Sequence, residues 1–308
     1  MTFLCLVAKE RAGILREVLA REMPDLPFVE KDDDFEPHAV RFMLAWEQPQ
    51  SLQESFPKLE IIFCVGAGID HFDLSALPAS LRVVRMVEPG LTAQMQHYAV
   101  MSVLALARDL PVYLQQQQAG LWVQRPIRPL EGLSVGVMGL GHIGRAVLTG
   151  LHPFGFPLRA WSRSRRCIDG VKCYHGPDEL ERFLAGTDIL ICLLPLTPET
   201  RGILSGEALA KLPRGAAIIN MGRGAHLDQT ALVALLDEGR LDAAILDVAE
   251  PEPLPQSHAL WKHPKVLLTP HVAGRTPMGS AAISIVENLR RYKTGTELVG
   301  EVDRTKGY

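Results

Sequence analysis

The sequence predicts an α/β fold with two Rossmann-like or flavodoxin-like domains, each built on a parallel sheet. Short apolar runs alternate with helical stretches almost from end to end, which is typical of parallel sheets covered by helices. One of these runs leads through a glycine-rich turn into a helix. A chain of 308 residues that is 47% hydrophobic can also bury more than one core.

The first domain is predicted to comprise residues 1–97 and 277–308. A helix over Gly13–Glu22 is expected after the first strand, and a last helix over about Met278–Tyr292 returns the chain to this domain. The predicted strands are the apolar runs Phe3–Val7, Val40–Ala45, Ile61–Val65 and Val83–Val87.

A long helix is expected to leave the first domain. Thr92 is placed to cap its N-terminus, and the helix ends at Pro111 or continues into the polar tract Gln115–Gln118. The segment Trp122–Leu133 contains two prolines and is predicted to connect to a second sheet.

The second domain is predicted to comprise residues 98–276. Its helices are expected to begin after Gly141, Pro177, Ser205 and Asp228. The predicted strands are Val135–Gly139, Leu158–Trp161, Ile189–Leu194, Ala217–Met221, Ala244–Val248 and Val266–Thr269.

Charge and cysteine content exclude several classes of protein. A net charge of -3 gives no basic surplus for nucleic acid or an anionic membrane. No apolar stretch nears the ~20 residues of a membrane span, and the N-terminus lacks the order of a signal peptide. We therefore expect a cytoplasmic protein that binds no metal and keeps its cysteines as buried thiols. The cysteines are Cys5, Cys64, Cys167, Cys173 and Cys192.

The segment Val135–Gly144 carries a Gly-x-Gly-x-x-Gly turn between an apolar strand and a helix. The glycines allow a tight turn, the approach of a pyrophosphate, and packing of the helix whose N-terminus faces the anion. Such a turn is common by itself. Here the flanking elements and the next strand at Leu158–Trp161 complete the pattern, so a dinucleotide site is predicted.

The end of that next strand distinguishes NAD from NADP. NAD enzymes carry an acid there, whereas this chain has Ser162, followed by Arg163, Arg165 and Arg166. An acid repels a 2′-phosphate, while a hydroxyl beside guanidinium groups accepts it. NADPH is therefore the predicted cofactor and NADH a weaker alternative. A solvated basic loop is the other interpretation of these arginines.

Three later segments place polar residues just beyond apolar strands, where open α/β sheets bind their ligands. Arg223 lies between two glycines and can bind a carboxylate or a ketone oxygen through its planar guanidinium. Asp247 lies at the end of the next predicted strand and Glu252 follows it, and His271 follows the last one. Each is more often structural when it occurs alone, but the set in this order indicates an active site.

The set resembles the D-isomer-specific 2-hydroxyacid dehydrogenase family, over nearly the whole chain. The family's motifs are matched by Gly66–Asp70, Leu194–Thr200, Asn220–Gly224, Glu252 and Pro270-His271. Leu44–Trp46, Gln94–Ala99, Trp161–Arg163 and Val302–Tyr308 look most similar to members that reduce glyoxylate and hydroxypyruvate. The resemblance implies an active site in the cleft between the two domains and a small 2-keto or 2-hydroxy acid as substrate.

The resemblance also implies a role for individual residues. Arg223 binds the substrate carboxylate and carbonyl, His271 is the acid and base, and Glu252 favours the protonated histidine. Asp247 is expected to contact the nicotinamide amide. Further cofactor contacts are expected at Gly139, Gly141, His142, Ile143, Gly144, Ser162, Arg163, Arg165, Pro195 and Thr200. Substrate contacts are expected at Trp46, Gly66, Ala67, Gly68, Arg223 and His271.

Two other functions remain as alternatives. A phosphoglycerate dehydrogenase is disfavoured because the chain ends at Tyr308, without room for a regulatory domain. A catalytically silent nucleotide sensor on the same fold has no chemical need for the set of Arg223, Glu252 and His271.

Three further points depend on the resemblance. Gln94–Tyr98 replaces the family's usual Val-Ala-Glu, which leaves the contacts beside the nicotinamide open. Trp46 either restricts the substrate pocket or belongs to the core. The resemblance suggests a homodimer through the long helix near Thr92–Leu110.

Overall fold

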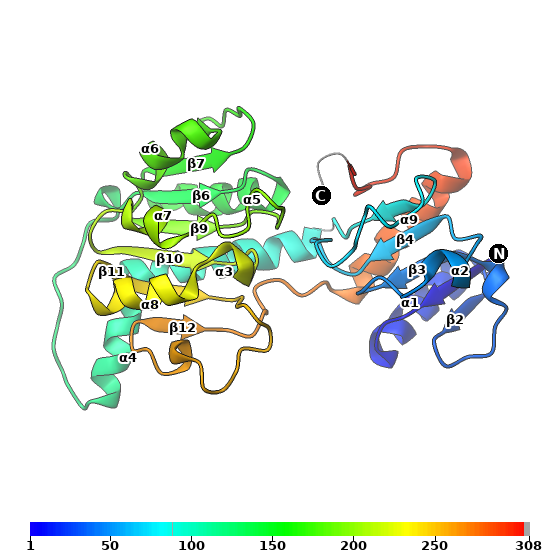
Figure 1. Ribbon diagram of the computed structural model, residues 1–308, viewed down its shortest axis with the longest axis horizontal. Helices are drawn as coiled ribbons and strands as arrows, with labels where there is room; N and C mark the ends of the chain where they lie inside the picture. Colours follow the sequence, from blue (N-terminus) through cyan, green and yellow to red (C-terminus); the bar gives the residue numbers. More distant parts are fainter. Residues whose placement is uncertain (88, 305–308) are drawn as a thin grey trace. The chain divides into compact units, whose positions relative to one another are not determined.

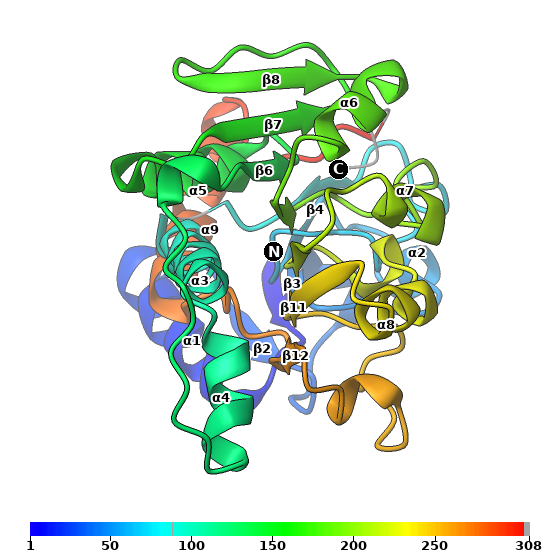
Figure 2. The ribbon, with the colours of Figure 1, turned by 90° about the vertical axis from the view of Figure 1, so that its left-hand side faces the viewer.

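The computed structural model describes residues 1–87 and 89–304. The chain forms two compact units, and Figures 1 and 2 show the elements of each. The first unit comprises Met1–Leu91 and the segment that begins at Arg275, and the second comprises Thr92–Gly274. The sequence places these boundaries a few residues further along, after residues 97 and 276. Residues 305–308, the end of the stretch that resembles the glyoxylate-reducing members, lie outside the described residues.

The first unit is built on a parallel sheet with the strand order β2-β1-β3-β4-β5. This is the flavodoxin-like order, in agreement with the predicted fold class. Strand β2 is not predicted from the sequence, because it is a short edge strand of half-buried residues without an apolar run. The strands are β1 (Thr2–Cys5), β2 (Phe28–Glu30), β3 (Val40–Ala45), β4 (Ile61–Cys64) and β5 (Arg82–Val84).

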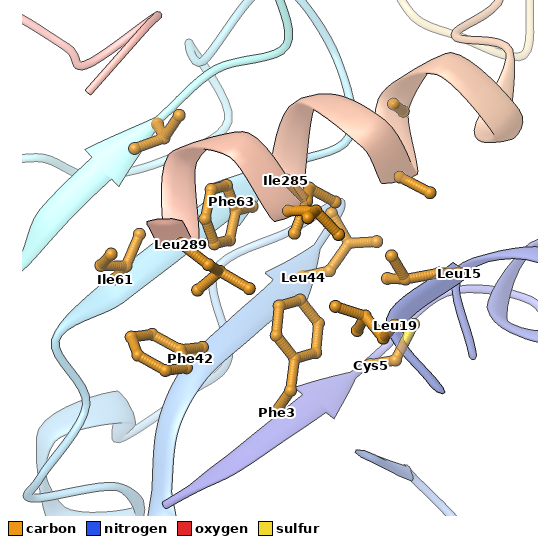
Figure 3. Close-up of a cluster of buried hydrophobic side chains, with 14 of the residues drawn as sticks. Phe3, Cys5, Leu15, Leu19, Phe42, Leu44, Ile61, Phe63, Ile285 and Leu289 are labelled. Atoms are coloured by element: carbon orange, nitrogen blue, oxygen red, sulfur yellow. The ribbon is translucent and has the colours of Figure 1, made fainter. Parts of the chain in front are cut away.

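Alternation along these strands gives the sheet two buried apolar faces. Phe3 and Phe63 lie on the face that packs against helices α1 and α9, and Figure 3 shows their rings beneath α9. Leu4 and Ile62 lie on the opposite face, with Leu52 of helix α2. The helices are α1 (Lys9–Glu22), α2 (Leu52–Ser55) and α9 (Met278–Thr294), with a 3-10 helix at Pro37–Ala39.

The second unit is built on a parallel sheet with the order β12-β11-β10-β9-β6-β7-β8. This is the Rossmann order with one added edge strand, and the order reverses between β6 and β9, where such folds bind ligands. Edge strand β8 is not predicted, because most of its side chains are exposed or half-buried. The strands are β6 (Val135–Met138), β7 (Leu158–Ser162), β8 (Val171–His175), β9 (Ile189–Cys192), β10 (Ala216–Asn220), β11 (Leu241–Leu246) and β12 (Val266–Leu268).

Helices cover both faces of this sheet, with α3 and α5 on one side and α6, α7 and α8 on the other (Figure 2). Helices α7 and α8 begin directly after Ser205 and Asp228 as predicted, and these two side chains cap them by accepting the N–H groups of Ala208 and Ala231. The helices are α3 (Pro89–Ala107), α4 (Leu110–Gln118), α5 (His142–Leu151), α6 (Leu180–Leu184), α7 (Gly206–Ala210) and α8 (Gln229–Asp237). The 3-10 helices are Leu130–Gly132, His152–Phe154, Pro177–Glu179, Gly224–His226 and Ala259–Trp261.

The long helix differs from the prediction. Helix α3 begins at Pro89 and already includes Thr92, so the predicted cap at Thr92 is wrong. Asp109 has a φ of 55°, which separates α3 from α4. Pro111 lies in the first turn of α4, where a backbone N–H has no partner within the helix, so the lack of an N–H costs no hydrogen bond. This proline therefore lies at the start of a helix and does not end one.

The cysteines are free thiols, and Cys5, Cys64 and Cys192 are buried as predicted. Burial raises the pKa of the Cys192 thiol to about 12, so this thiol stays neutral. The prediction of a buried thiol is wrong for Cys167, which is exposed because it lies on the loop after β7. Among the helices that the structure describes, none is long and apolar enough to cross a membrane.

Candidate active site

The turn between β6 and α5 contains the predicted glycine motif. Gly139 has a φ of 104°, and a Cβ on Gly144 would lie 1.8 Å from the Gly139 carbonyl oxygen, so both positions require glycine. A Cβ on Gly141 would meet no atom within 4 Å. Packing within the protein therefore does not require glycine at position 141, and the open space beside it fits a pyrophosphate.

Helix α5 begins directly after Gly141. Among the described residues no side chain caps this end, so its first N–H groups remain for an anion. His142 at the first position is exposed and Ile143 is half-buried. The bare backbone, the uncapped helix and the space at Gly141 together fit a dinucleotide.

Ser162 ends strand β7, at the position where NAD enzymes carry an acid. Its side chain is buried, and the hydroxyl donates to the Ser164 carbonyl at 2.8 Å. Arg163, Arg165 and Arg166 are exposed, and the last two line a hollow of about 260 Å³ beside strand β8. The strand end is therefore neutral and the loop after it is positively charged.

The loop after β9 lies across the switch point of the sheet from the glycine turn. The Thr200 hydroxyl donates to the Pro195 carbonyl at 2.7 Å and accepts the Thr197 N–H at 2.8 Å, which closes the loop. A hydrogen bond from Thr197 lowers the pKa of Glu199, and the charge of Arg163 adds to this shift. The loop thus lies close to the arginines after β7.

Arg223 follows strand β10 and is half-buried. The buried side chain of Asn220 closes the turn, because its Nδ2 donates to the Arg223 carbonyl at 3.0 Å and its Oδ1 accepts the Gly222 N–H at 3.2 Å. A Cβ on Gly224 would lie 2.0 Å from the Ala249 backbone, so glycine is required there. This close approach joins the arginine turn to the segment that leads to Glu252.

Glu252 and His271, both predicted for the site, form a hydrogen-bonded pair. Their atoms Oε2 and Nδ1 lie 2.8 Å apart. Because a carboxylate only accepts, the histidine Nδ1–H is the donor. The second carboxylate oxygen accepts the Ala249 N–H at 3.0 Å, so the Glu252 side chain is fixed at both oxygens. Both side chains are partly exposed, at 40% for Glu252 and 34% for His271.

Asp247 is almost fully buried, and the turn of residues 269–273 wraps around it. Its Oδ1 accepts the Val272 N–H at 2.9 Å and its Oδ2 accepts the Ala273 N–H at 2.8 Å. Its main-chain carbonyl accepts the His271 N–H at 2.7 Å. The carboxylate predicted to contact the nicotinamide amide therefore also holds the turn that carries His271.

The first unit contains the loop predicted to bind the substrate carboxylate. The Gly66 carbonyl accepts the Met86 N–H at 2.9 Å, and a Cβ on Gly66 would lie 3.1 Å from the Trp46 ring. Trp46 stacks on His71 with a centroid distance of 4.7 Å and is 45% exposed. Trp46 is therefore not a core residue, and it lies directly against the Gly66–Gly68 loop.

Comparison with known proteins agrees with this geometry. The family model of the D-isomer specific 2-hydroxyacid dehydrogenase NAD binding domain matches residues 100–273. A glyoxylate/hydroxypyruvate reductase A from Salmonella paratyphi B is 41% identical over 273 residues, which cover 87% of each chain. This chain belongs to the D-isomer specific 2-hydroxyacid dehydrogenase family.

Solved structures of the family superpose on the whole chain. A family member from Xanthobacter autotrophicus in complex with NADPH and MES is 38% identical, with a TM-score of 0.93 over 100% of this chain and 99% of that one. An NADPH-dependent glyoxylate/hydroxypyruvate reductase from Sinorhizobium meliloti with NADP and sulfate is 32% identical, with a TM-score of 0.91 and the same coverage.

The structure also places beside Arg223 a buried histidine that is not predicted from the sequence. His226 is fully buried, its Nδ1 accepts the Arg223 N–H at 3.1 Å, and its Nε2 lies 3.3 Å from the Pro195 carbonyl oxygen. Since a main-chain N–H can only donate, Nδ1 accepts and Nε2–H donates. His226 thereby connects the arginine turn to the loop after β9. Its position three residues after Arg223 is the only sequence signal for this role.

The Gln94–Tyr98 segment lies on α3 and contacts two parts of the second unit. Gln96 Nε2 donates to the Ala146 carbonyl of α5 at 2.7 Å. Tyr98 Oη lies 2.6 Å from Thr269 Oγ1, at the start of the His271 turn. The segment that departs from the common family pattern thus contacts both the dinucleotide helix and the histidine turn.

Proposed function

We propose that this chain reduces small 2-keto acids with NADPH, converting glyoxylate to glycolate and hydroxypyruvate to D-glycerate. The observation that carries the proposal is the 2.8 Å hydrogen bond between His271 and Glu252 at the carboxyl end of a Rossmann sheet. The relatives support the choice of substrate, since the Salmonella and Sinorhizobium proteins are named glyoxylate/hydroxypyruvate reductases.

His271 provides the proton in this proposal. Its Nδ1–H donates to Glu252, so Nε2 is the nitrogen that gives a proton to the keto oxygen. The reduced nicotinamide supplies the hydride when it is bound. The carboxylate charge stabilises the imidazolium that reduction requires, and in the oxidative direction the neutral histidine takes the proton back.

Arg223 binds the substrate carboxylate and stabilises the alkoxide that develops at the keto oxygen. Its guanidinium presents donors in a planar fork that matches a carboxylate, and a donor aimed at developing charge lowers the barrier. Asn220 and His226 fix the main chain of this residue, which supports a role that depends on its position.

The cofactor preference rests on the loop after β7. A neutral Ser162 does not repel a 2′-phosphate, and the exposed Arg163 and Arg165 can bind it with charge-assisted hydrogen bonds. The Ser162 proton already goes to Ser164, so in this proposal the serine contributes neutrality and the arginines contribute affinity. The turn of Gly139, Gly141 and Gly144 binds the pyrophosphate, which both cofactors contain. NADH is therefore a weaker alternative cofactor.

Trp46 and the Gly66–Gly68 loop give the substrate preference. The loop's main chain binds the carboxylate, and the indole against Gly66 restricts the acid to two or three carbons. The stacking of Trp46 on His71 supports this role, because it fixes the ring beside the loop.

The protein is proposed to act as a cytoplasmic homodimer through α3, α4 and the chain that follows. Large apolar side chains are exposed in the segment after α4, among them Trp122 at 96% and Ile127 at 82%, and their gathering in one segment supports an interface with a partner. Sedimentation velocity tests the dimer, and a Trp122→Asp variant is expected to sediment as a monomer. Free thiols support a reducing compartment.

A steady-state panel tests the proposed function. Glyoxylate, hydroxypyruvate, pyruvate and phosphohydroxypyruvate are each measured with NADPH and with NADH. The proposal predicts the highest kcat/KM for glyoxylate or hydroxypyruvate with NADPH. A preference for phosphohydroxypyruvate would instead assign the chain to phosphoglycerate oxidation, and no turnover of any acid would contradict the enzyme proposal.

A further inference from the structure

A chain of hydroxyl groups links helix α3 to the turn that carries His271. Tyr98 Oη lies 2.6 Å from Thr269 Oγ1, and Thr269 donates to Asp247 Oδ1 at 2.6 Å. A threonine hydroxyl has one proton, and here that proton goes to the carboxylate. The Tyr98 hydroxyl must therefore be the donor to Thr269, so the chain of hydrogen bonds has a single direction.

The chain ends on the group that shapes the histidine turn. Asp247 accepts the N–H groups of Val272 and Ala273 through its carboxylate and the His271 N–H through its carbonyl. His271 itself has a φ of 54°, in the left-handed region that residues with a side chain rarely adopt. Such a conformation persists only where the surrounding contacts hold it.

We propose that Tyr98 is a positioning residue for the acid: acting through Thr269 and Asp247, its hydroxyl holds His271 in the left-handed conformation that aims the imidazole at Glu252. The inference rests on the proposed function, in which His271 is the proton donor. Tyr98 acts through the turn, without contact to the reacting atoms. This role would explain why a tyrosine occurs in the Gln94–Tyr98 segment, which departs from the common family pattern.

The state of the Tyr98 hydroxyl agrees with this role. Burial raises the pKa of Tyr98, and the negative charge of Asp247 raises it further. The net shift is upward, so the phenol keeps its proton and remains a donor throughout the pH range of the assay. The hydrogen bond from Tyr98 to Thr269 therefore persists under the assay conditions.

The experiment compares three substitutions along the chain with one control. Tyr98→Phe removes only the tyrosine hydroxyl. Thr269→Val removes the hydroxyl that joins Tyr98 to Asp247, and Thr269→Ser keeps that hydroxyl. Tyr174→Phe is the matched control, because Tyr174 is a buried tyrosine of the same unit whose hydroxyl accepts Arg159 Nη1 at 2.8 Å. Each variant is measured for kcat, KM, NADPH affinity and amide hydrogen exchange of the peptide that covers residues 269–273.

For Tyr98→Phe we expect kcat to fall about three- to tenfold, the effect of one lost hydrogen bond, with NADPH affinity unchanged. Exchange of the peptide that covers residues 269–273 should become faster. Thr269→Ser, which keeps the hydroxyl, should have nearly the wild-type kcat and the wild-type exchange rate in this peptide. Tyr98→Phe combined with Thr269→Val should lose no more than Thr269→Val alone, because both changes break the same chain.

Wild-type kcat and exchange in Tyr98→Phe would overturn the inference. So would equal losses in Tyr98→Phe and Tyr174→Phe, since these would reflect general destabilisation. The exchange measurement needs no turnover. If wild type reduces no keto acid while exchange still responds as expected, the proposed function fails and the link from Tyr98 to the turn stands.

Discussion

Two regions of the second unit differ in how firmly the protein holds them, although both follow strand ends of one sheet. The turn after β12 wraps around the buried Asp247, which holds Val272 and Ala273 through its carboxylate and His271 through its carbonyl. The loop after β7 instead presents Arg163, Arg165 and Arg166 as exposed side chains.

The difference corresponds to two kinds of chemistry. Proton transfer depends on placing an acid within hydrogen-bond reach of one oxygen, so the histidine turn is fixed in advance. Binding of a charged phosphate depends mainly on positive charge within reach of it, and exposed arginine side chains supply that charge. Changes in the first region should therefore affect kcat strongly, and changes in the second should affect affinity moderately.

The largest effect is expected for His271→Ala, which removes the acid but not the turn. A positioned acid contributes about 10²–10⁴-fold, so kcat should fall by about that factor. NADPH affinity, measured by fluorescence titration, should stay at the wild-type value. A comparable loss of cofactor affinity would show that His271 belongs to the cofactor site and would remove the contrast between the two regions.

Arg223→Lys should have the next largest effect. Lysine keeps the charge but loses the planar fork, and loss of a donor to a developing oxyanion reduces kcat by about 10²–10³-fold. The keto-acid KM should rise as well, because the same group holds the substrate carboxylate, while NADPH binds normally. If steady-state kinetics give a wild-type kcat/KM, Arg223 is only a loop residue.

A smaller effect than in these two variants is expected in the arginine loop. A charge-assisted hydrogen bond contributes about 1.5–3 kcal/mol, so Arg163→Ala should weaken NADPH binding about ten- to a hundredfold and leave NADH almost unchanged. Arg214→Ala is the control, since this exposed arginine precedes β10 and so lies at the amino end of the strands. Equal losses for both cofactors would contradict the assignment of Arg163 to the 2′-phosphate.

The sequence predicts the parallel sheets and the polar groups at their carboxyl ends, because buried parallel strands are continuous apolar runs. Edge strands β2 and β8 carry partly exposed side chains and lack this signal. The break at Asp109 depends on one left-handed residue, and Pro111 fits either a helix end or a helix start.

Some site residues can likewise be predicted from the sequence, and others are seen only in the structure. Arg223, Glu252 and His271 each follow a strand, so their position at one edge of the sheet can be inferred from the order of the motifs. The contacts of His226 with the Pro195 carbonyl and of Tyr98 with Thr269 join residues that are 31 and 171 positions apart. No local pattern encodes such a pairing, and only the folded unit shows it.

The central claim is that Glu252 holds His271 as the acid, and steady-state kinetics of Glu252→Gln test it most directly. Glutamine removes the negative charge beside the imidazole, and its single oxygen can accept from His271 Nδ1 or from the Ala249 N–H but not from both. The kcat for reduction should therefore fall, by no more than the about 10²–10⁴-fold expected for loss of the acid itself, while NADPH affinity stays at the wild-type value. A wild-type kcat in Glu252→Gln would contradict the claim.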